Sequence, residues 1–225
     1  MITILETTTK NPISLMGERA GICWGADISD PKKNYQRGLD CIKSGHGRVM
    51  EFVNVEMVIE GYSARVIREW YTHIGGAPTR LQESTRYVNC DNFDYVIPPT
   101  ISNDFARQGS YVALMALIKH TYENLINDGA SREDAAMILP LGMKTKIVDK
   151  RNLRNLVDMS RQRMCGRAYI EYRQLFFHLS RALRDYSDEW KELIDMLFHP
   201  KCEELGYCPE KNSCGKMPKR LDNKE

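Results

Sequence analysis

The sequence predicts a single α/β (α+β) domain in which a central antiparallel or mixed sheet is flanked by long helices. Residues 49–60 predict the sheet, because apolar and polar side chains alternate there as in a half-buried strand. Residues 104–127 and 152–183 predict the helices, because apolar side chains recur there every three or four positions. A chain of 225 residues is long enough to bury a hydrophobic core around such a sheet.

The composition is that of an ordinary soluble globular protein, with 42% hydrophobic and 28% charged residues. A formal net charge of +2 does not indicate a general nucleic-acid-binding protein. No apolar run approaches the roughly 18 residues that a membrane span needs, and residues 1–10 lack the pattern of a secretory signal peptide. Seven cysteines, an odd number, favour a reduced cytoplasmic location over a disulfide framework.

Short elements are predicted at the start of the chain. A strand over residues 2–5 precedes helices over residues 12–20 and 35–44, and glycines 45 and 47 end the second helix. In the strand over 49–60, one set of side chains is predicted to share a face: Val53, Val55, Met57 and Ile59. The opposite face is predicted to carry Asn54, Glu56 and Glu60.

Residues 68–87 hold the most distinctive pattern. The helix that leads into them cannot continue through Gly75, Gly76 and Pro78, because glycines cost backbone entropy and proline disfavours helix before it. The loop that follows holds five polar side chains within seven residues: Arg80, Gln82, Glu83, Ser84 and Arg86. Guanidinium, amide and hydroxyl groups together suit an anionic or phosphorylated ligand. The alternative is a surface loop whose charges lie in water.

The remaining elements follow from apolar spacing and capping signals. Residues 93–97 predict a strand that ends at two prolines, and the helix over 104–127 carries a stripe expected to be core. The stripe is Tyr111, Met115, Ile118, Tyr122 and Leu125. Ser131 and Asp134 resemble a capping box that opens a short helix. A long helix is predicted from about 152 through 183, and another over 188–198.

The long helix follows a basic stretch that begins at Lys144, and Arg163 is its most unusual charge. No acidic residue lies three or four positions from Arg163, and Arg167 repels it from four positions away. An anion site and a solvated helix face are both consistent with this pattern.

Two separated blocks resemble the flavin-dependent thymidylate synthases. In the first, residues 82–87 (Gln-Glu-Ser-Thr-Arg-Tyr) resemble the family's Glu-x-Ser-x-Arg-Tyr, and His73 lies in a Thr-His-Ile triplet where the family has Arg-His-Arg. Gly45-His46 and Glu51 resemble a Gly-His and a Glu that contact flavin in the family. In the second block, residues 152–171 resemble a segment whose Asn and later His contact flavin and whose Arg contacts uracil.

The resemblance implies an FAD-dependent methyltransferase that converts deoxyuridylate (dUMP) to thymidylate. Methylenetetrahydrofolate would supply the carbon and NADPH would reduce the flavin, in a cytoplasmic homotetramer with shared active sites. The implied flavin-binding residues are His46, Glu51, His73, Arg80, Asn152 and Arg167. The implied substrate-binding residues are Gln82, Glu83, Ser84, Arg86 and Arg163. Arg163 and Ser84 are also the predicted catalytic residues, with Ser84 acting as a binding hydroxyl because no base adjoins it.

Two positions depart from the family at the nucleotide phosphate. The family's phosphate-binding Gln and Arg correspond to Glu69 and Ala136, and Glu69 can instead pair with Arg65 on the same helix face. The phosphate is therefore expected to be held by a rearranged set centred on Arg86, with Lys144, Lys146 or Arg80 compensating. Two alternatives remain open: a related flavin enzyme that acts on another pyrimidine nucleotide, and a non-enzymatic homologue that binds RNA through its basic surface.

The last residues form a separate feature. We expect residues 1–200 to form the synthase-like domain and residues 201–225 to form a cysteine-containing tail. His199, Cys202, Cys208 and Cys214 offer four soft or borderline ligands within sixteen residues, although their spacing is wider than that of a zinc knuckle. A structural metal and unligated or redox-active thiols are the two interpretations.

Overall fold

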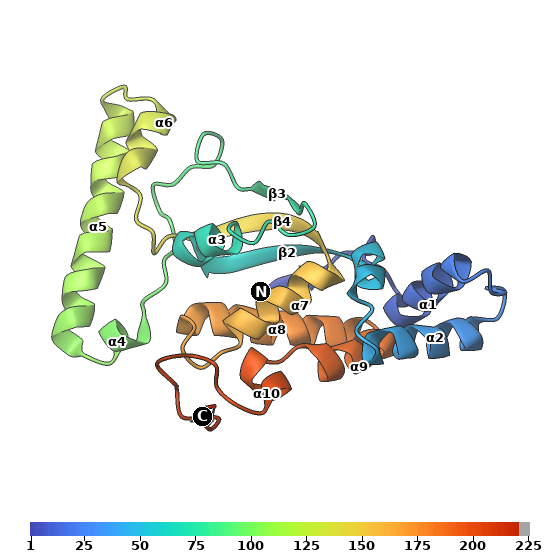
Figure 1. Ribbon diagram of the computed structural model, residues 1–225. Coiled ribbons are helices and arrows are strands. Elements are labelled where there is room, and N and C mark those ends of the chain that lie inside the picture. The colour runs from blue at the N-terminus through green and yellow to red at the C-terminus, as the bar shows by residue number, and fades with distance from the viewer. Residues whose placement is uncertain (221–225) are drawn as a thin grey trace. The chain divides into compact units, whose positions relative to one another are not determined.

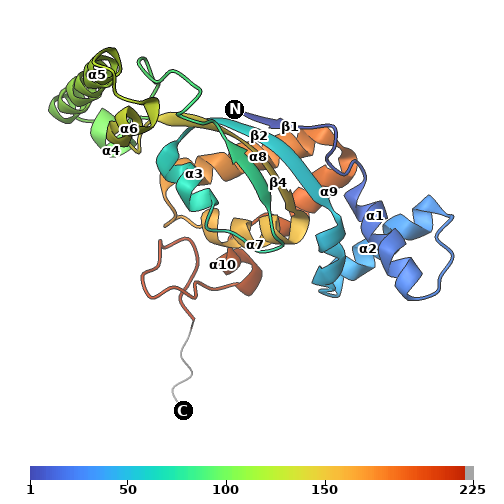
Figure 2. The same cartoon turned by 90° about the horizontal axis from the view of Figure 1, so that it is seen from above.

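Helices and one small sheet form the chain in the computed structural model, which describes residues 1–220 (Figure 1). The sheet contains β1 (Ile2–Ile4), β2 (Asn54–Ser63), β3 (Thr79–Gln82) and β4 (Lys144–Asn152). Its strand order is β1-β2-β4-β3, and Figure 2 shows β2 and β4 running alongside each other. Backbone bonds join residues 5 and 56, 60 and 1, 64 and 143, and 153 and 53, so β1–β2 and β2–β4 are antiparallel. The predicted α+β class is confirmed.

The chain forms two compact units that interleave along the sequence. The first unit contains Met1 and residues 59–72 and 80–148, and the second contains residues 2–58, 73–79 and 149–220. Strands β2 and β4 therefore contribute residues to both units. The last five residues of the predicted tail, 221–225, lie outside the described residues.

The first unit is built around one long helix. Its elements are α3 (Ala64–Trp70), α4 (Pro99–Ser102), α5 (Phe105–Asn127), α6 (Arg132–Ala135), the 3-10 turn η2 (Ala136–Ile138) and parts of the strands. Tyr122 of α5 packs with Cys90 and Ala135 in a small buried cluster. Met115 is also buried, but Tyr111, Ile118 and Leu125 of the predicted core stripe are only partly buried. Much of α5 therefore remains exposed.

The second unit contains the larger core. Its helical elements are α1 (Pro12–Cys23), α2 (Pro31–Lys43), the 3-10 helix η1 (Gly47–Phe52), α7 (Leu153–Arg163), α8 (Ile170–Tyr186), α9 (Asp188–Leu197) and α10 (Lys201–Leu205). Helices α1 and α2 lie side by side (Figure 2), and α8 packs on β1, α7 and α9. The α1–α2 approach requires glycine, because a Cβ at Gly17 would lie 1.7 Å from the backbone oxygen of Asn34.

The alternation in β2 was predicted correctly, but its start was not. Val53, Val55, Met57 and Ile59 are fully buried, as predicted for the core face. Residues 47–52 instead form η1, in which the Val53 N–H donates to the carbonyl of Met50. The predicted strand over residues 93–97 is wrong, because it makes only one isolated bridge, Tyr95 to Met143, before the two prolines.

Three further boundaries differ from the prediction. The long helix over 152–183 is two helices, α7 and α8, and the interruption contains Gly166. Strand β3 forms at the start of the polar loop, and β4 forms within the basic stretch. In β4 the buried positions include Asp149 and Arg151, so hydropathy does not alternate there although burial does.

Strand β4 ends in a buried ion pair within the second unit. Arg151 donates from Nε and Nη2 to both oxygens of Asp149, at 2.6 and 2.7 Å, and neither side chain is exposed. Its Nη1 donates to Oδ1 of Asn155 at 2.6 Å. These bonds satisfy charges that would otherwise be costly to bury.

No helix of the described chain has the length and apolar character needed to cross a membrane.

Replacing Arg151 with methionine should lower the free energy of unfolding by about 3–5 kcal/mol, because it leaves Asp149 buried without its counter-charge. Lys150→Met, at the exposed neighbouring position of the same strand, is the matched control and should change stability by less than about 0.5 kcal/mol. Urea unfolding measures both variants. Equal stabilities for the two would show that the ion pair does not hold this strand.

Candidate functional site

A histidine and an arginine that lie far apart in the sequence meet in the second unit. Arg163, at the end of α7, donates from Nε to Nε2 of His73 at 3.1 Å. The Arg163 guanidinium also lies over the ring of Tyr172, 4.7 Å from its centroid. His73 meets the same ring edge-on, with 6.4 Å between the centroids. The sequence suggested that Arg163 lacks a partner, and the structure corrects this: its partners are a histidine and an aromatic face.

The electrostatics of this cluster fix the protonation of His73. Burial and, to a smaller extent, the positive charges of Arg163 and Arg151 together lower the pKa of His73 to about 4. His73 is therefore neutral at physiological pH. Because Nε2 accepts the bond from Arg163, the proton of the neutral ring is on Nδ1. The cluster thus offers a ligand one fixed positive charge and one ring N–H donor.

The turn that carries His73 rests on the start of α7. Asn152 caps α7 by accepting the Asn155 N–H at 2.9 Å. Gly76 has φ of +73°, and a Cβ there would lie 2.2 Å from Nδ2 of Asn152. Any residue other than glycine would therefore strain the turn and collide with the cap. The structure places Asn152 as a support for the His73 turn.

A cavity of about 650 Å³ lies beside His46 in the second unit. Trp24 and Phe52 line it together with three arginines, which are Arg19, Arg48 and Arg154. Glu51, predicted to contact flavin, ion-pairs with Arg154 at 2.5 Å. Exposed aromatic rings beside guanidinium groups suit a ligand that has both a ring and a phosphate.

The sequence predicted His46 and Glu51 in this region but not the arginines or Trp24. The sequence offered one clue to these arginines, because Arg48 lies two positions after His46. Arg19 and Trp24 reach the cavity from the end of α1 and the residue after it, which no local pattern indicated.

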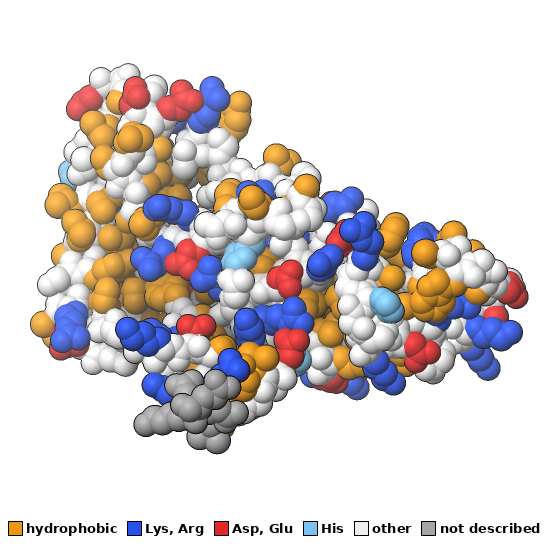
Figure 3. Space-filling model, viewed as in Figure 1, with side chains coloured by type: hydrophobic (Ala, Val, Ile, Leu, Met, Phe, Trp, Pro, Cys, Tyr) orange, Lys and Arg blue, Asp and Glu red, His pale blue; other side chains and the backbone are white. Residues whose placement is uncertain are grey.

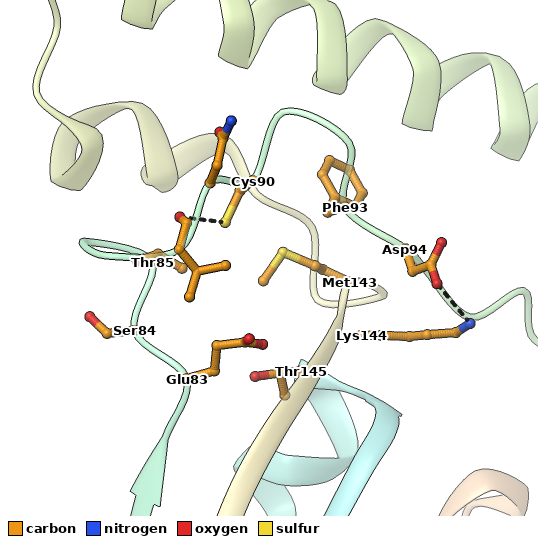
Figure 4. A pocket seen from close by; sticks show the side chains of 11 residues that line it. Glu83, Ser84, Thr85, Cys90, Phe93, Asp94, Met143, Lys144 and Thr145 are labelled. Carbon is orange, nitrogen blue, oxygen red and sulfur yellow. Dashed lines mark hydrogen bonds and ion pairs between the residues drawn. The ribbon is translucent and has the colours of Figure 1, made fainter. Parts of the chain in front are cut away.

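A second, smaller cavity of about 270 Å³ lies in the first unit, and Glu83, Ser84, Lys144 and Thr145 are among the residues that line it (Figure 4). Glu83 points toward Thr145, whereas Ser84 points away from it. The Ser84 hydroxyl accepts the backbone N–H of Arg86 at 3.3 Å. This is a local turn contact, and it brings no base to the hydroxyl.

The other predicted substrate residues are held by neighbours in the first unit. Gln82 donates to the Thr145 hydroxyl at 3.2 Å, and Arg86 ion-pairs with Glu133 at 2.5 Å. Glu69 pairs with Arg65 at 3.8 Å, as predicted from their spacing.

Lys144 and Lys146, the predicted compensating cations, each meet a carboxylate. Lys144 lies 3.5 Å from Asp94, and Lys146 lies 2.9 Å from Glu60. Ala136 opens η2 and offers no polar group.

Two arginines predicted to bind flavin have different surroundings. The Arg80 guanidinium stacks on Tyr71 at 4.3 Å, and its buried Nη1 has no hydrogen-bond partner among the described residues. Arg167 donates to the backbone oxygen of Asn212 at 2.6 Å. Arg80 therefore has one buried donor without a partner among the described residues, whereas Arg167 holds the C-terminal segment.

The family model that describes the thymidylate synthase complementing protein matches residues 4–186. The chain belongs to this family. The matched residues include every predicted flavin and substrate residue, and they stop before the cysteines of the tail.

Known members of the family are similar over most of the chain. A protein of Nitratidesulfovibrio vulgaris is 32% identical over 191 residues, covering 80% of this chain and 75% of its own. A protein of Pyrococcus furiosus is 31% identical, covering 75% and 70%. One of Clostridium tetani is 29% identical, covering 96% and 93%. Each is named a flavin-dependent thymidylate synthase.

The low pKa of His73 predicts a pH dependence of stability. Because the folded pKa of about 4 lies below the ordinary 6.5, the unfolded chain binds more protons between these values. The free energy of unfolding should therefore fall as the pH drops from about 6.5 to 4, and His73 should contribute no further loss below that.

Urea unfolding across this window compares the native protein with His73→Gln, which should have a smaller slope. Arg163→Met should narrow the pH range over which stability falls, because it removes one positive charge that lowers the pKa of His73. If the free energy of unfolding of His73→Gln changed with pH as steeply as that of the native protein, the low pKa of His73 would be contradicted.

Proposed function

We propose that this protein is a flavin-dependent thymidylate synthase, which methylates dUMP reductively to thymidylate. FAD supplies the hydride, methylenetetrahydrofolate the one-carbon unit, and NADPH the electrons that reduce the flavin. The observation that carries the proposal is the His73–Arg163 pair, which joins a residue from each of the two blocks that resemble the family. Family membership over residues 4–186 supports the same reaction.

The residues beside His46 fit a flavin dinucleotide. Three arginines offer charge to the two phosphates, and Trp24 and Phe52 offer faces for a ring. The Arg154–Glu51 ion pair holds one of these guanidinium groups in place. His46 and Glu51 thus belong to this set, and Arg48 and Arg154 extend it.

Arg163 is suited to bind the uracil ring of dUMP. Its charge is fixed and desolvated on one side by Tyr172, and neutral His73 keeps it in place without neutralising it. A guanidinium in this state donates to uracil carbonyls and stabilises negative charge that develops on the ring during methylation. Residue types and protonation therefore agree with the role that the family resemblance implies for Arg163.

Purification and assay test the function directly. The protein should be yellow, retain FAD, and form thymidylate from dUMP, methylenetetrahydrofolate and NADPH. A flavoprotein that is active only on another pyrimidine nucleotide would support the first alternative. A colourless protein that cannot be reconstituted with FAD would support an RNA-binding homologue.

We also propose that the protein is a cytoplasmic homotetramer. The support is the exposed apolar surface of α5, which Figure 3 shows as a broad hydrophobic area over that helix. Phe105 is 94% exposed, Leu114 51% and Leu117 60%. Apolar area of this kind favours association with another chain. Light scattering of the purified protein measures the assembly.

Arg80→Ala should weaken FAD retention about tenfold or more, because the buried Nη1 would lose a charge-assisted contact with a ligand phosphate. Arg181→Ala, an exposed arginine on α8, is the matched control. Fluorescence of released flavin measures the dissociation constant. Equal FAD affinity in the two variants would exclude Arg80 from the flavin site.

Arg86→Ala should abolish measurable dUMP binding and leave FAD in place, because we propose that Arg86 exchanges Glu133 for the substrate phosphate. Calorimetric titration with dUMP and with deoxyuridine tests this, and Arg181→Ala again serves as control. The native protein should bind dUMP more tightly than deoxyuridine. Equal affinities would mean that the natural substrate carries no phosphate at this position.

A further inference from the structure

Four cysteines meet around one cavity of about 480 Å³ in the second unit. Cys165 follows α7, Cys202 lies in α10, and Cys208 and Cys214 lie in the described tail. Cys202 and Cys208 are each only 8% exposed. The fourth cysteine comes from 37 residues before Cys202, so the tail alone could not indicate it.

Neighbouring contacts show that these thiols are close together. Cys202 interacts electrostatically with Cys165 and with Cys208, so these three thiols lie near one another. A Cβ at Gly166 would lie 3.1 Å from Sγ of Cys214, which places that thiol beside the residue after Cys165. None of the seven cysteines forms a disulfide.

His199 is not part of this group. It does not line the cavity, and its Nε2 lies 3.1 Å from the backbone oxygen of Met196. The ligand set suggested by the sequence is therefore changed at one position, with Cys165 in place of His199.

The described tail lacks an apolar reason to fold. Residues 206–220 contain no helix and no strand, and their large apolar side chains are Tyr207 and Met217. Such a segment buries too little apolar surface to offset its lost conformational entropy. Yet its ends are joined, because the Cys208 N–H donates to the Pro218 oxygen at 2.7 Å. A cross-link at the cysteines would supply the missing stabilisation.

The charges around the cavity match a metal bound by four thiolates. Four thiolates and one divalent ion carry a net charge of −2. Arg161, Arg163, Arg167 and Lys201 line the same cavity. Their positive charges offset the negative charge of the bound site.

We propose that Cys165, Cys202, Cys208 and Cys214 bind a structural zinc ion that fixes the tail against the end of α7. Four sulfur ligands and no open position are typical of structural zinc. As the side chains stand, no group of three or more His, Cys, Asp or Glu within residues 1–220 is arranged so that it could hold a metal ion. Binding therefore requires the thiols to rotate toward the cavity and to release their protons.

Zinc content tests the proposal independently of the proposed function. The full chain is purified with neither chelator nor metal-affinity tag, under reducing conditions, and analysed by mass spectrometry of metals. About one zinc per chain is expected. Cys165→Ser and Cys214→Ser should each lower the zinc content tenfold or more. His199→Ala and Cys23→Ser, an exposed cysteine outside the group, should keep it.

Cobalt substitution tests the site in the native protein, so its result does not depend on whether the variants fold. Native protein loaded with Co²⁺ should show the visible bands of tetrahedral cobalt with sulfur ligands, and zinc should displace them. The proposal is overturned by native protein that binds neither metal with all thiols reduced, by a disulfide within the group, or by an iron–sulfur chromophore. Loss of zinc in His199→Ala but not in Cys165→Ser would overturn the ligand set.

Discussion

The buried pair of Arg151 and Asp149 is the interaction on which the candidate site depends. Asp149 neutralises Arg151 through two hydrogen bonds, and Nη1 of Arg151 donates to Asn155. The Asn155 N–H in turn engages Asn152, whose side chain lies against Gly76 in the turn that carries His73. The charge of Arg151 also helps to lower the pKa of His73. One ion pair thus supports the turn that carries the histidine and contributes, after burial and Arg163, to its low pKa.

Local sequence patterns predicted the elements that are determined by residues close together in the sequence. The period of two in β2 was visible because its buried residues are apolar, and the serine that caps α6 was visible from its spacing to Asp134. Strand β4 was missed because two of its buried residues, Asp149 and Arg151, are charged and form an ion pair with each other. Hydropathy cannot reveal a strand whose core positions are satisfied by an ion pair.

The candidate site shows the same division. The family resemblance indicated His73 and Arg163 separately, but no spacing predicts that residues 90 positions apart share a hydrogen bond. Helical spacing around Arg163 did not indicate its contacts with the His73 imidazole and the Tyr172 ring, because both residues lie on other elements. Cys165 was missed for a related reason, since the tail was searched only for ligands close in sequence. In both cases the neighbouring residue belongs to another element, and only the folded chain brings the two close together.

Arg163 connects the two features of the second unit that the sequence treated as separate. It donates to His73 through Nε, and it also lines the cavity of the four cysteines. The guanidinium of Arg163 therefore lies beside both the cysteine cavity and the neutral His73. Because any ligand that prefers one position of a shared group changes the affinity of the other site equally, the proposed zinc site and the proposed uracil site would be thermodynamically linked through Arg163. The C-terminal segment beyond the family match would then act on the same arginine that the proposed reaction uses.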